Sequence, residues 1–111
     1  MTLFSWMLVG HLVGDFLLQT RWMAEGKTVR LLPLAVHSLT YTTAVGLFSF
    51  FAGGVAFWGL VVIFLAHLLL DERRFVSFWV RKILGADNLP WLKIMVDQCW
   101  HILILALVTL L

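Results

Sequence analysis

The sequence predicts an all-α protein: a bundle of four transmembrane helices with a short interfacial helix between the third and the fourth. Hydrophobic residues make up 62% of the 111 residues, and charged residues only 13%. So few charges could not cover the surface of a soluble domain of this size. Four strongly apolar segments alternate with short connections, and the basic residues are confined to two of these connections. We therefore expect a single membrane domain spanning residues 1–111.

The four apolar segments cover residues 3–19, 31–51, 55–70 and 92–111. A transmembrane helix takes about 20 apolar residues, with about 17 as a lower limit. The first and third segments therefore predict short spans.

Turn and cap residues mark the ends of these segments. Pro33 suits the first turn of the second helix, and Gly53-Gly54 separates the second segment from the third. Asp87-Asn88 followed by Pro90 predicts the start of the fourth helix. Residues 74–84 mix aromatic with basic side chains, which predicts the short helix in the membrane interface. A solvated loop is the alternative for this segment.

The basic residues predict the orientation. All eight lie in the first and third connections or at their edges: Arg21, Lys27, Arg30, Arg73, Arg74, Arg81, Lys82 and Lys93. Because basic loops stay in the cytoplasm, we expect a multi-pass protein with both termini on the non-cytoplasmic side. No basic region precedes the first apolar segment, so we expect this helix to be retained rather than cleaved as a signal peptide.

Overall charge and cysteine content exclude some alternatives. The formal net charge of +2 gives no indication of nucleic-acid binding. The single cysteine, Cys99, excludes an internal disulfide, and we expect it to pack as a small apolar residue.

Four histidines lie in the four apolar segments, one in each: His11, His37, His67 and His101. Three of them have an aspartate four residues away, in the pairs His11/Asp15, His67/Asp71 and Asp97/His101. Residues four apart share one face of a helix. At 1.5 Å per residue the four imidazoles lie roughly 9–15 Å from the basic edges of their segments. A closed bundle would therefore bring all seven groups into one layer.

This layer predicts a metal site. Imidazole nitrogens and carboxylate oxygens suit zinc, manganese or iron. The predicted ligands are His11, Asp15, His37, His67, Asp71, Asp97 and His101. Three ionised aspartates would leave a charge of −1 with one divalent ion and +1 with two, which a bridging hydroxide would cancel. A low-dielectric site favours neutrality, so both stoichiometries stay open.

Other residues could support the layer, and other readings of it remain. Gln19, Gln98 and one or two of the polar residues between Ser38 and Thr43 could hydrogen-bond into the site. Gly10 and Gly14 form a small-xxx-small pair that permits close helix approach. The alternative to a metal site is a set of interhelical histidine–aspartate hydrogen bonds. A ferritin-like di-iron site would need glutamates with a different spacing.

The chain resembles the DUF3307 family of small bacterial and phage membrane proteins. The opening motif is the most specific part of the resemblance, and the match covers almost the whole chain: Gly10 to Thr20, Trp22-Met23-Ala24, Lys27, His37, His67 with Asp71, and Asp97-Gln98 with His101. The resemblance implies the inner membrane of a bacterium, for a bacterial or phage-encoded protein, and supplies no activity. Membrane-bound metal-dependent hydrolases with histidine-rich spans offer a weaker analogy.

These observations give a leading hypothesis and two alternatives. The leading hypothesis is a metal-dependent hydrolase with Asp15, Asp71 and Asp97 as ligands, bridges or a general base, acting on a lipid or a small phosphate or carboxylic ester. The first alternative is a metal-ion or proton transporter, which we would expect to be a homo-oligomer. The second is a non-catalytic membrane subunit with a structural metal.

Overall fold

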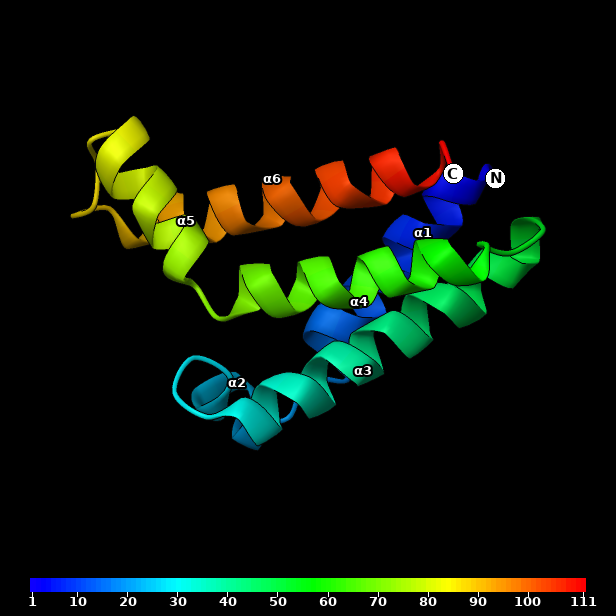
Figure 1. Ribbon diagram of the computed structural model, residues 1–111, viewed down its shortest axis with the longest axis horizontal. Coiled ribbons are helices and arrows are strands. Elements are labelled where there is room, and N and C mark those ends of the chain that lie inside the picture. The colour runs from blue at the N-terminus through cyan, green and yellow to red at the C-terminus, as the bar shows by residue number, and fades with distance from the viewer.

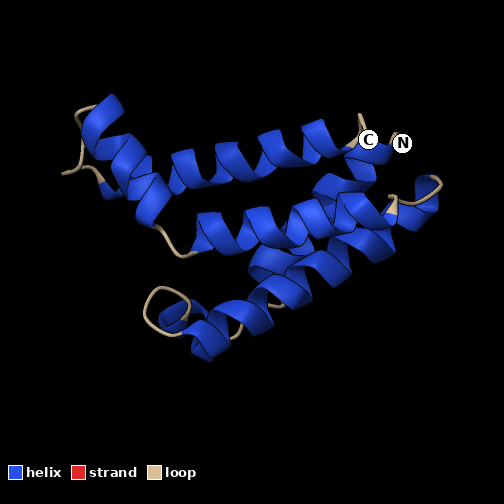
Figure 2. Ribbon diagram, in the orientation of Figure 1, coloured by secondary structure: helices blue, strands red, loops and turns tan.

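The computed structural model describes residues 1–111 and contains six α-helices and no strand (Figures 1 and 2). The helices are α1 (Leu3–Leu12), α2 (Arg21–Gly26), α3 (Leu31–Ser49), α4 (Phe57–Asp71), α5 (Arg74–Phe78) and α6 (Pro90–Val108). Three of them continue in a helical turn of different pitch: α1 and α5 in the π-helical segments Val13–Leu17 and Trp79–Ile83, and α3 in the 3₁₀ turn Phe50–Ala52.

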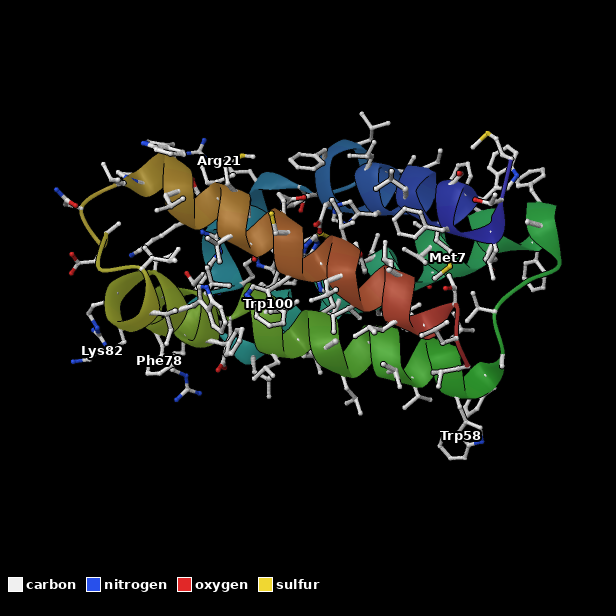
Figure 3. All side chains as sticks on the ribbon, turned by 90° about the horizontal axis from the view of Figure 1, so that it is seen from above. Met7, Arg21, Trp58, Phe78, Lys82 and Trp100 are labelled. Carbon is white, nitrogen blue, oxygen red and sulfur yellow. The ribbon has the colours of Figure 1, made fainter.

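The long helices run side by side, with α1 packed against α3, α3 against α4, and α4 against α6 (Figure 1). Both termini and the turn between α3 and α4 lie at one end, here called the terminal end. The short helices α2 and α5 lie at the opposite end, here called the basic end. Figure 3 shows Lys82 and Trp58 at these opposite ends. The molecule measures 42 Å along its longest axis.

The all-α prediction is confirmed, and each of the four predicted apolar segments forms a helix. Two helical segments are long and apolar enough to cross a membrane by length and composition, Leu31–Ala52 and Pro90–Val108. The apolar helices Leu3–Leu17 and Phe57–Asp71 are shorter. Helix length alone therefore supports two spans rather than four.

Local sequence signals explain where the helices begin and end. The Thr2 hydroxyl accepts a hydrogen bond from the Ser5 amide, 3.1 Å away, and caps α1. Pro90 begins α6, where its missing N–H costs nothing. Gly53 and Gly54 both have positive φ, 98° and 83°, a backbone conformation that glycine adopts without steric cost. They reverse the chain between α3 and α4.

The predicted close approach at Gly10 and Gly14 occurs between α1 and α3. A Cβ added to Gly10 would lie 2.7 Å from Val45 Cα, and one added to Gly14 would lie 3.0 Å from Tyr41 Cα. Any side chain at Gly10 would therefore push the two backbones apart. This contact brings the histidine of α1 close to the polar residues of α3.

Of the two short helices at the basic end, the sequence predicted α5 and did not predict α2. The predicted helix over residues 74–84 is present as α5 and its π-helical continuation, held by Trp100, whose ring lies 5.1 Å from those of both Phe75 and Trp79. Helix α2 was not predicted: the sequence indicated only a basic connection there. Its six residues are too few to show a helical periodicity, although Thr20 caps it by accepting from the Met23 amide.

The interior holds an unusual share of polar side chains. Ten of the 28 buried residues are polar or charged: His11, Asp15, Lys27, His37, Ser38, Ser49, His67, Asp71, Asp97 and His101. Large apolar side chains lie on the outside of the long helices, for example Leu47 on α3, Trp58 on α4 and Leu107 on α6. The fold therefore turns polar groups inward and apolar groups outward.

Candidate metal centre

All seven predicted site residues lie together in the interior, and none is more than 5% exposed. They come from four helical segments: α1 with its π-helical turn, α3, α4 and α6. Their donor atoms form two groups of potential metal ligands that share Asp71, and in each group the atoms lie within 4.8 Å of one another. The four-residue group is Asp15, His37, His67 and Asp71, and the three-residue group is Asp71, Asp97 and His101.

The four-residue group has the dimensions of a tetrahedral metal site. Asp15 Oδ1 lies 3.2 Å from His37 Nε2 and 3.1 Å from His67 Nε2. Asp71 Oδ2 lies 3.0 Å and 3.6 Å from the same two nitrogens. Ligands about 2.0–2.2 Å from a tetrahedral ion are separated by about 3.3–3.6 Å. The two carboxylates and two imidazoles therefore surround a space of the right size for one ion.

The three-residue group is more open. His101 Nε2 lies 3.0 Å from Asp71 Oδ1, and the Asp97 carboxylate places an oxygen within 4.8 Å of the other ligand atoms. Three protein ligands leave a coordination position free, as catalytic metal sites require. Because Asp71 directs Oδ2 to the first group and Oδ1 to the second, its carboxylate could bridge two ions.

The hydrogen bonds in the site leave key atoms without partners. His101 Nδ1 donates to the backbone carbonyl of Asp97 at 2.7 Å, since a carbonyl can only accept. In the neutral ring Nε2 therefore presents a lone pair towards Asp71 Oδ1. Neither of these two buried atoms has a hydrogen-bond partner, and the same holds for both ring nitrogens of His37. Buried lone pairs facing one another repel, and a cation between them removes the repulsion.

His11 belongs to neither group. Its Nδ1 lies 2.8 Å from the Tyr41 hydroxyl and its Nε2 lies 2.8 Å from Gln98 Oε1, so both ring nitrogens have hydrogen-bond partners. The nearest carboxylate oxygen, Asp15 Oδ2, is 3.6 Å from Nδ1. The geometry favours His11 as a residue that positions the ligands rather than as a ligand.

Lys27 is the functional residue that the sequence reasoning missed. Although it comes directly after α2, its side chain turns into the bundle, where its Nζ donates to Asp71 Oδ2 at 2.9 Å and to Gln19 Oε1 at 2.8 Å. Gln19 in turn donates to the Asp15 backbone carbonyl. The sequence did contain a signal for it. The apolar segments and their edges hold three aspartates and no buried lysine or arginine to balance their charge. With Lys27 included, the three carboxylates and one ammonium carry −2, the charge that one divalent ion neutralises.

Polar residues of α3 and α6 hold the imidazoles in place, as the sequence suggested for some of them. The Ser38 hydroxyl lies 3.0 Å from His67 Nδ1, which leaves His67 Nε2 directed at Asp15. The Tyr41 ring stacks on His67 with centroids 4.0 Å apart. Such partners on the other ring nitrogen fix the tautomer of a ligating histidine.

Two cavities adjoin the site. A small cavity of about 10 Å³ lies between α4 and α6, with Tyr41, His67 and His101 among its lining residues. This is close to the volume that one water molecule needs, about 10–15 Å³ on this measure. At the basic end a larger hollow of about 310 Å³ is lined in part by Lys27, Arg30, Glu72 and Arg74. Lys27 connects this hollow to Asp71.

Apolar residues separate the site from the terminal end of the bundle. On every long helix the buried core residue lies on the terminal-end side of the histidine: Met7 before His11, Val45 after His37, Ile63 before His67 and Leu105 after His101. These side chains pack as one cluster. The polar layer is therefore bounded by an apolar cluster on the side of the terminal end.

Comparison with known proteins gives one match. Residues 3–111 match the family model DUF3307, described as a protein of unknown function. No curated protein and no solved structure matches the chain.

Proposed function

Because the chain belongs to the DUF3307 family, whose description carries no activity, we propose its function from the site: a membrane-embedded metalloenzyme that hydrolyses an ester or phosphate ester. The observation that carries the proposal is the convergence of buried imidazoles and carboxylates, among which His37 Nε2, His101 Nε2 and Asp71 Oδ1 have no hydrogen-bond partner. The proposal has three parts, namely the membrane location, the metal and the reaction.

The membrane location is supported by the distribution of side chains. The exterior of α3, α4 and α6 carries exposed Leu, Phe and Trp, while the aspartates of these helices, Asp71 and Asp97, are buried. An exposed apolar surface of this extent is unfavourable in water and favourable in lipid. The 42 Å length of the molecule is close to the thickness of a bilayer with its headgroups, about 40–45 Å. We propose that all four long helical segments cross the membrane, in bacterial cells the inner one, with the basic end in the cytoplasm.

The metal is supported by geometry and charge. We propose that the four-residue group holds a tightly bound zinc, manganese or iron ion, since one divalent ion neutralises the net charge of −2 carried by three aspartates and Lys27. A second ion at the three-residue group would leave an excess of two positive charges. It should therefore bind more weakly and be accompanied by an anion. The number of ions bound per chain, one or two, then depends on the metal concentration and on whether an anionic substrate is bound.

The reaction is supported by the surroundings of the three-residue group. A divalent ion there would supply Lewis-acid activation of water. The cavity beside His67 and His101 has room for about one water molecule. Asp97 Oδ1 is buried without a hydrogen-bond partner, so it is available to accept a proton from that water and return it to the leaving oxygen. The basic hollow that leads to Lys27 favours a substrate with an anionic group, such as a lipid phosphate.

The transport alternative is less well supported. A conducting path needs polar groups on both sides of the binding site, and the apolar cluster of Met7, Val45, Ile63 and Leu105 closes the terminal end. A structural role for the metal remains the second alternative. It differs from the enzyme in one measurable way: the metal-loaded wild-type protein should then release no phosphate from any ester.

The test begins with elemental analysis of protein purified in detergent, incubated with zinc, manganese or iron and passed through a desalting column. We expect about one ion per chain in the wild type and none in His67→Ala, with Lys82→Gln as an exposed control that retains the ion. Loaded protein should then release phosphate from a lipid phosphate or an aryl phosphate, and Asp97→Asn should keep its ion and lose this release. Wild-type protein without stoichiometric metal would overturn the metal site. Metal uptake into liposomes that depends on His67 would instead favour transport.

A further inference from the structure

A second polar hollow at the basic end shares Glu72 and Arg74 with the hollow beside Lys27 and contains no metal-ligand candidate. It has a volume of about 370 Å³ and is lined by Glu72, Arg73, Arg74, Ser77, Phe78 and Arg81. Three arginines and one glutamate give this hollow a net charge of +2. None of its residues belongs to either metal-ligand group.

Two of the three arginines have no carboxylate partner. Glu72 is fully engaged by Arg74, whose Nε and Nη2 donate to its two carboxylate oxygens at 2.9 and 3.1 Å. Arg73 and Arg81 form no ion pair; the Lys and Arg ion pairs of the chain are those of Arg21, Lys27 and Arg74. The hollow therefore presents two guanidinium groups that form no ion pair within the protein.

Arg73 is held in a costly conformation. It is the only residue other than glycine with positive φ, at 78°. An arginine there is strained, and such strain persists where the surroundings fix the residue in place. Its Nε is buried and has no hydrogen-bond acceptor. A buried guanidinium N–H without an acceptor requires one from outside the chain.

The position of the hollow indicates where that acceptor comes from. Phe78, on its rim, is 47% exposed, and the nearby π-helical turn and loop expose Ile83 and Leu84. Exposed apolar side chains beside exposed arginines are typical of the boundary between acyl chains and headgroups. Figure 3 shows Phe78 and Lys82 together on the outside of this end of the molecule.

We propose that this hollow binds the phosphate of an anionic phospholipid headgroup. The planar forks of Arg73 and Arg81 would each donate to phosphate oxygens, and the Ser77 hydroxyl offers a further donor. The lipid's acyl chains would lie along the exposed apolar surface beside Phe78. This binding rests on the membrane location proposed above and is independent of the metal and of the reaction.

The chain offers a matched pair of variants to test this. Arg81 lines the hollow and its neighbour Lys82 does not, so Arg81→Gln and Lys82→Gln remove the same charge one residue apart. Purified protein in detergent is titrated with phosphatidylglycerol or phosphatidylcholine, and bound lipid is counted by native mass spectrometry. We expect preference for phosphatidylglycerol. Arg81→Gln should weaken its binding about 10- to 100-fold, as loss of charged hydrogen bonds does, and Lys82→Gln by about fivefold or less. Equal losses would mean a diffuse surface attraction and overturn the site.

A second variant separates binding from folding. Arg73→Gly suits the positive φ and removes the whole side chain with its guanidinium, so relief of the backbone strain offsets the lost contacts and the variant should stay folded while losing lipid binding. Retained binding in this variant would contradict the proposal.

Two further experiments test whether the bound phosphate belongs to a lipid and whether the protein lies in the membrane. Inorganic phosphate added at the total lipid concentration should not displace the lipid; displacement would identify a soluble phosphate as the occupant. Wild-type protein recovered in the soluble fraction of cells, without detergent, would refute the membrane location itself. Loss of lipid binding in Arg81→Gln protein with its metal content unchanged would support the hollow separately from the metal centre.

Discussion

His101 Nε2 and Asp71 Oδ1 lie 3.0 Å apart in the interior, and no hydrogen bond joins them. The reason is visible at the other side of the ring, where His101 Nδ1 donates to the Asp97 carbonyl and so holds the ring at a fixed orientation. Two buried groups at this distance need a shared cation or a well-directed proton. Because neither atom has a hydrogen-bond partner, a shared cation would satisfy both.

The first prediction follows from the position of Asp71 in both ligand groups. Asp71→Asn replaces a bridging carboxylate by a neutral amide of the same shape and should abolish binding of both ions. Elemental analysis should show less than a tenth of the wild-type metal. The rise in melting temperature on metal addition, which reflects binding to the folded state only, should disappear. A variant that keeps one ion per chain would show that Asp71 is not a ligand of the tight site.

The second prediction concerns Asp97, which belongs only to the three-residue group. Asp97→Asn should retain the tight ion and lose the weak one. Isothermal titration with zinc should therefore show two classes of site in the wild type and one in the variant. Loss of all metal from Asp97→Asn would indicate a single site built from both groups.

The third prediction concerns Lys27, whose ammonium occupies the position next to Asp71 that a metal would favour. Lys27→Met leaves Asp71 without its partner in the metal-free protein, and removing one member of a buried ion pair costs about 3–5 kcal/mol. The metal-free variant should therefore melt at a lower temperature than the wild type. With the competing ammonium gone, the divalent ion should raise the melting temperature of the variant by more than that of the wild type.

Arg30→Met is the control for this prediction. Arg30 lines the same hollow and forms no ion pair with a site aspartate, so its loss should leave both the metal-free stability and the metal-induced shift close to wild-type values. An equal effect of the two substitutions would assign the change to the charge of the hollow rather than to Asp71.

The sequence predicts the helices well because long apolar runs and their caps are local features. The four apolar segments correspond to α1, α3, α4 and α6 with their continuations. The histidines could be placed in one layer because one residue rises a fixed distance along a helix. Distance along the axis is therefore readable from the sequence, and each histidine was predicted at a similar depth.

The pairing of side chains could not be read in the same way. The three pairs spaced four residues apart are all 3.6 Å apart, whereas the closest contacts cross between helices, such as His37 with Asp71 at 3.0 Å and His67 with Asp15 at 3.1 Å. These depend on the rotation of each helix about its axis, to which the packing of Gly10 and Gly14 against α3 contributes for α1. Lys27 was missed for a related reason: it follows a short helix whose direction the sequence does not indicate.

The fourth prediction separates His11 from the ligands. Because both of its ring nitrogens are occupied by Tyr41 and Gln98, His11→Gln should keep the tight ion and lower its affinity about 10- to 100-fold, the usual effect of losing a positioning partner. His67→Gln, the same change at a proposed ligand, should abolish binding. Chelator competition measures both. Equal loss of metal in the two variants would restore His11 to the ligand set.

The fifth prediction tests the backbone contact that sets the site geometry. Gly10→Ala places a methyl group 2.7 Å from Val45 Cα, and overpacking a tight contact costs about 1–3 kcal/mol. Gly46→Ala is the matched control, because its new methyl group would meet only the flexible end of Leu60 at 3.2 Å. The higher helix propensity of alanine should stabilise this variant by about 1 kcal/mol. Thermal unfolding in detergent should therefore move in opposite directions for the two variants. Since the shift at Gly10 also moves α1 relative to α3, Gly10→Ala should weaken metal binding although it alters no ligand; unchanged metal affinity would mean that α1 does not set the position of Asp15.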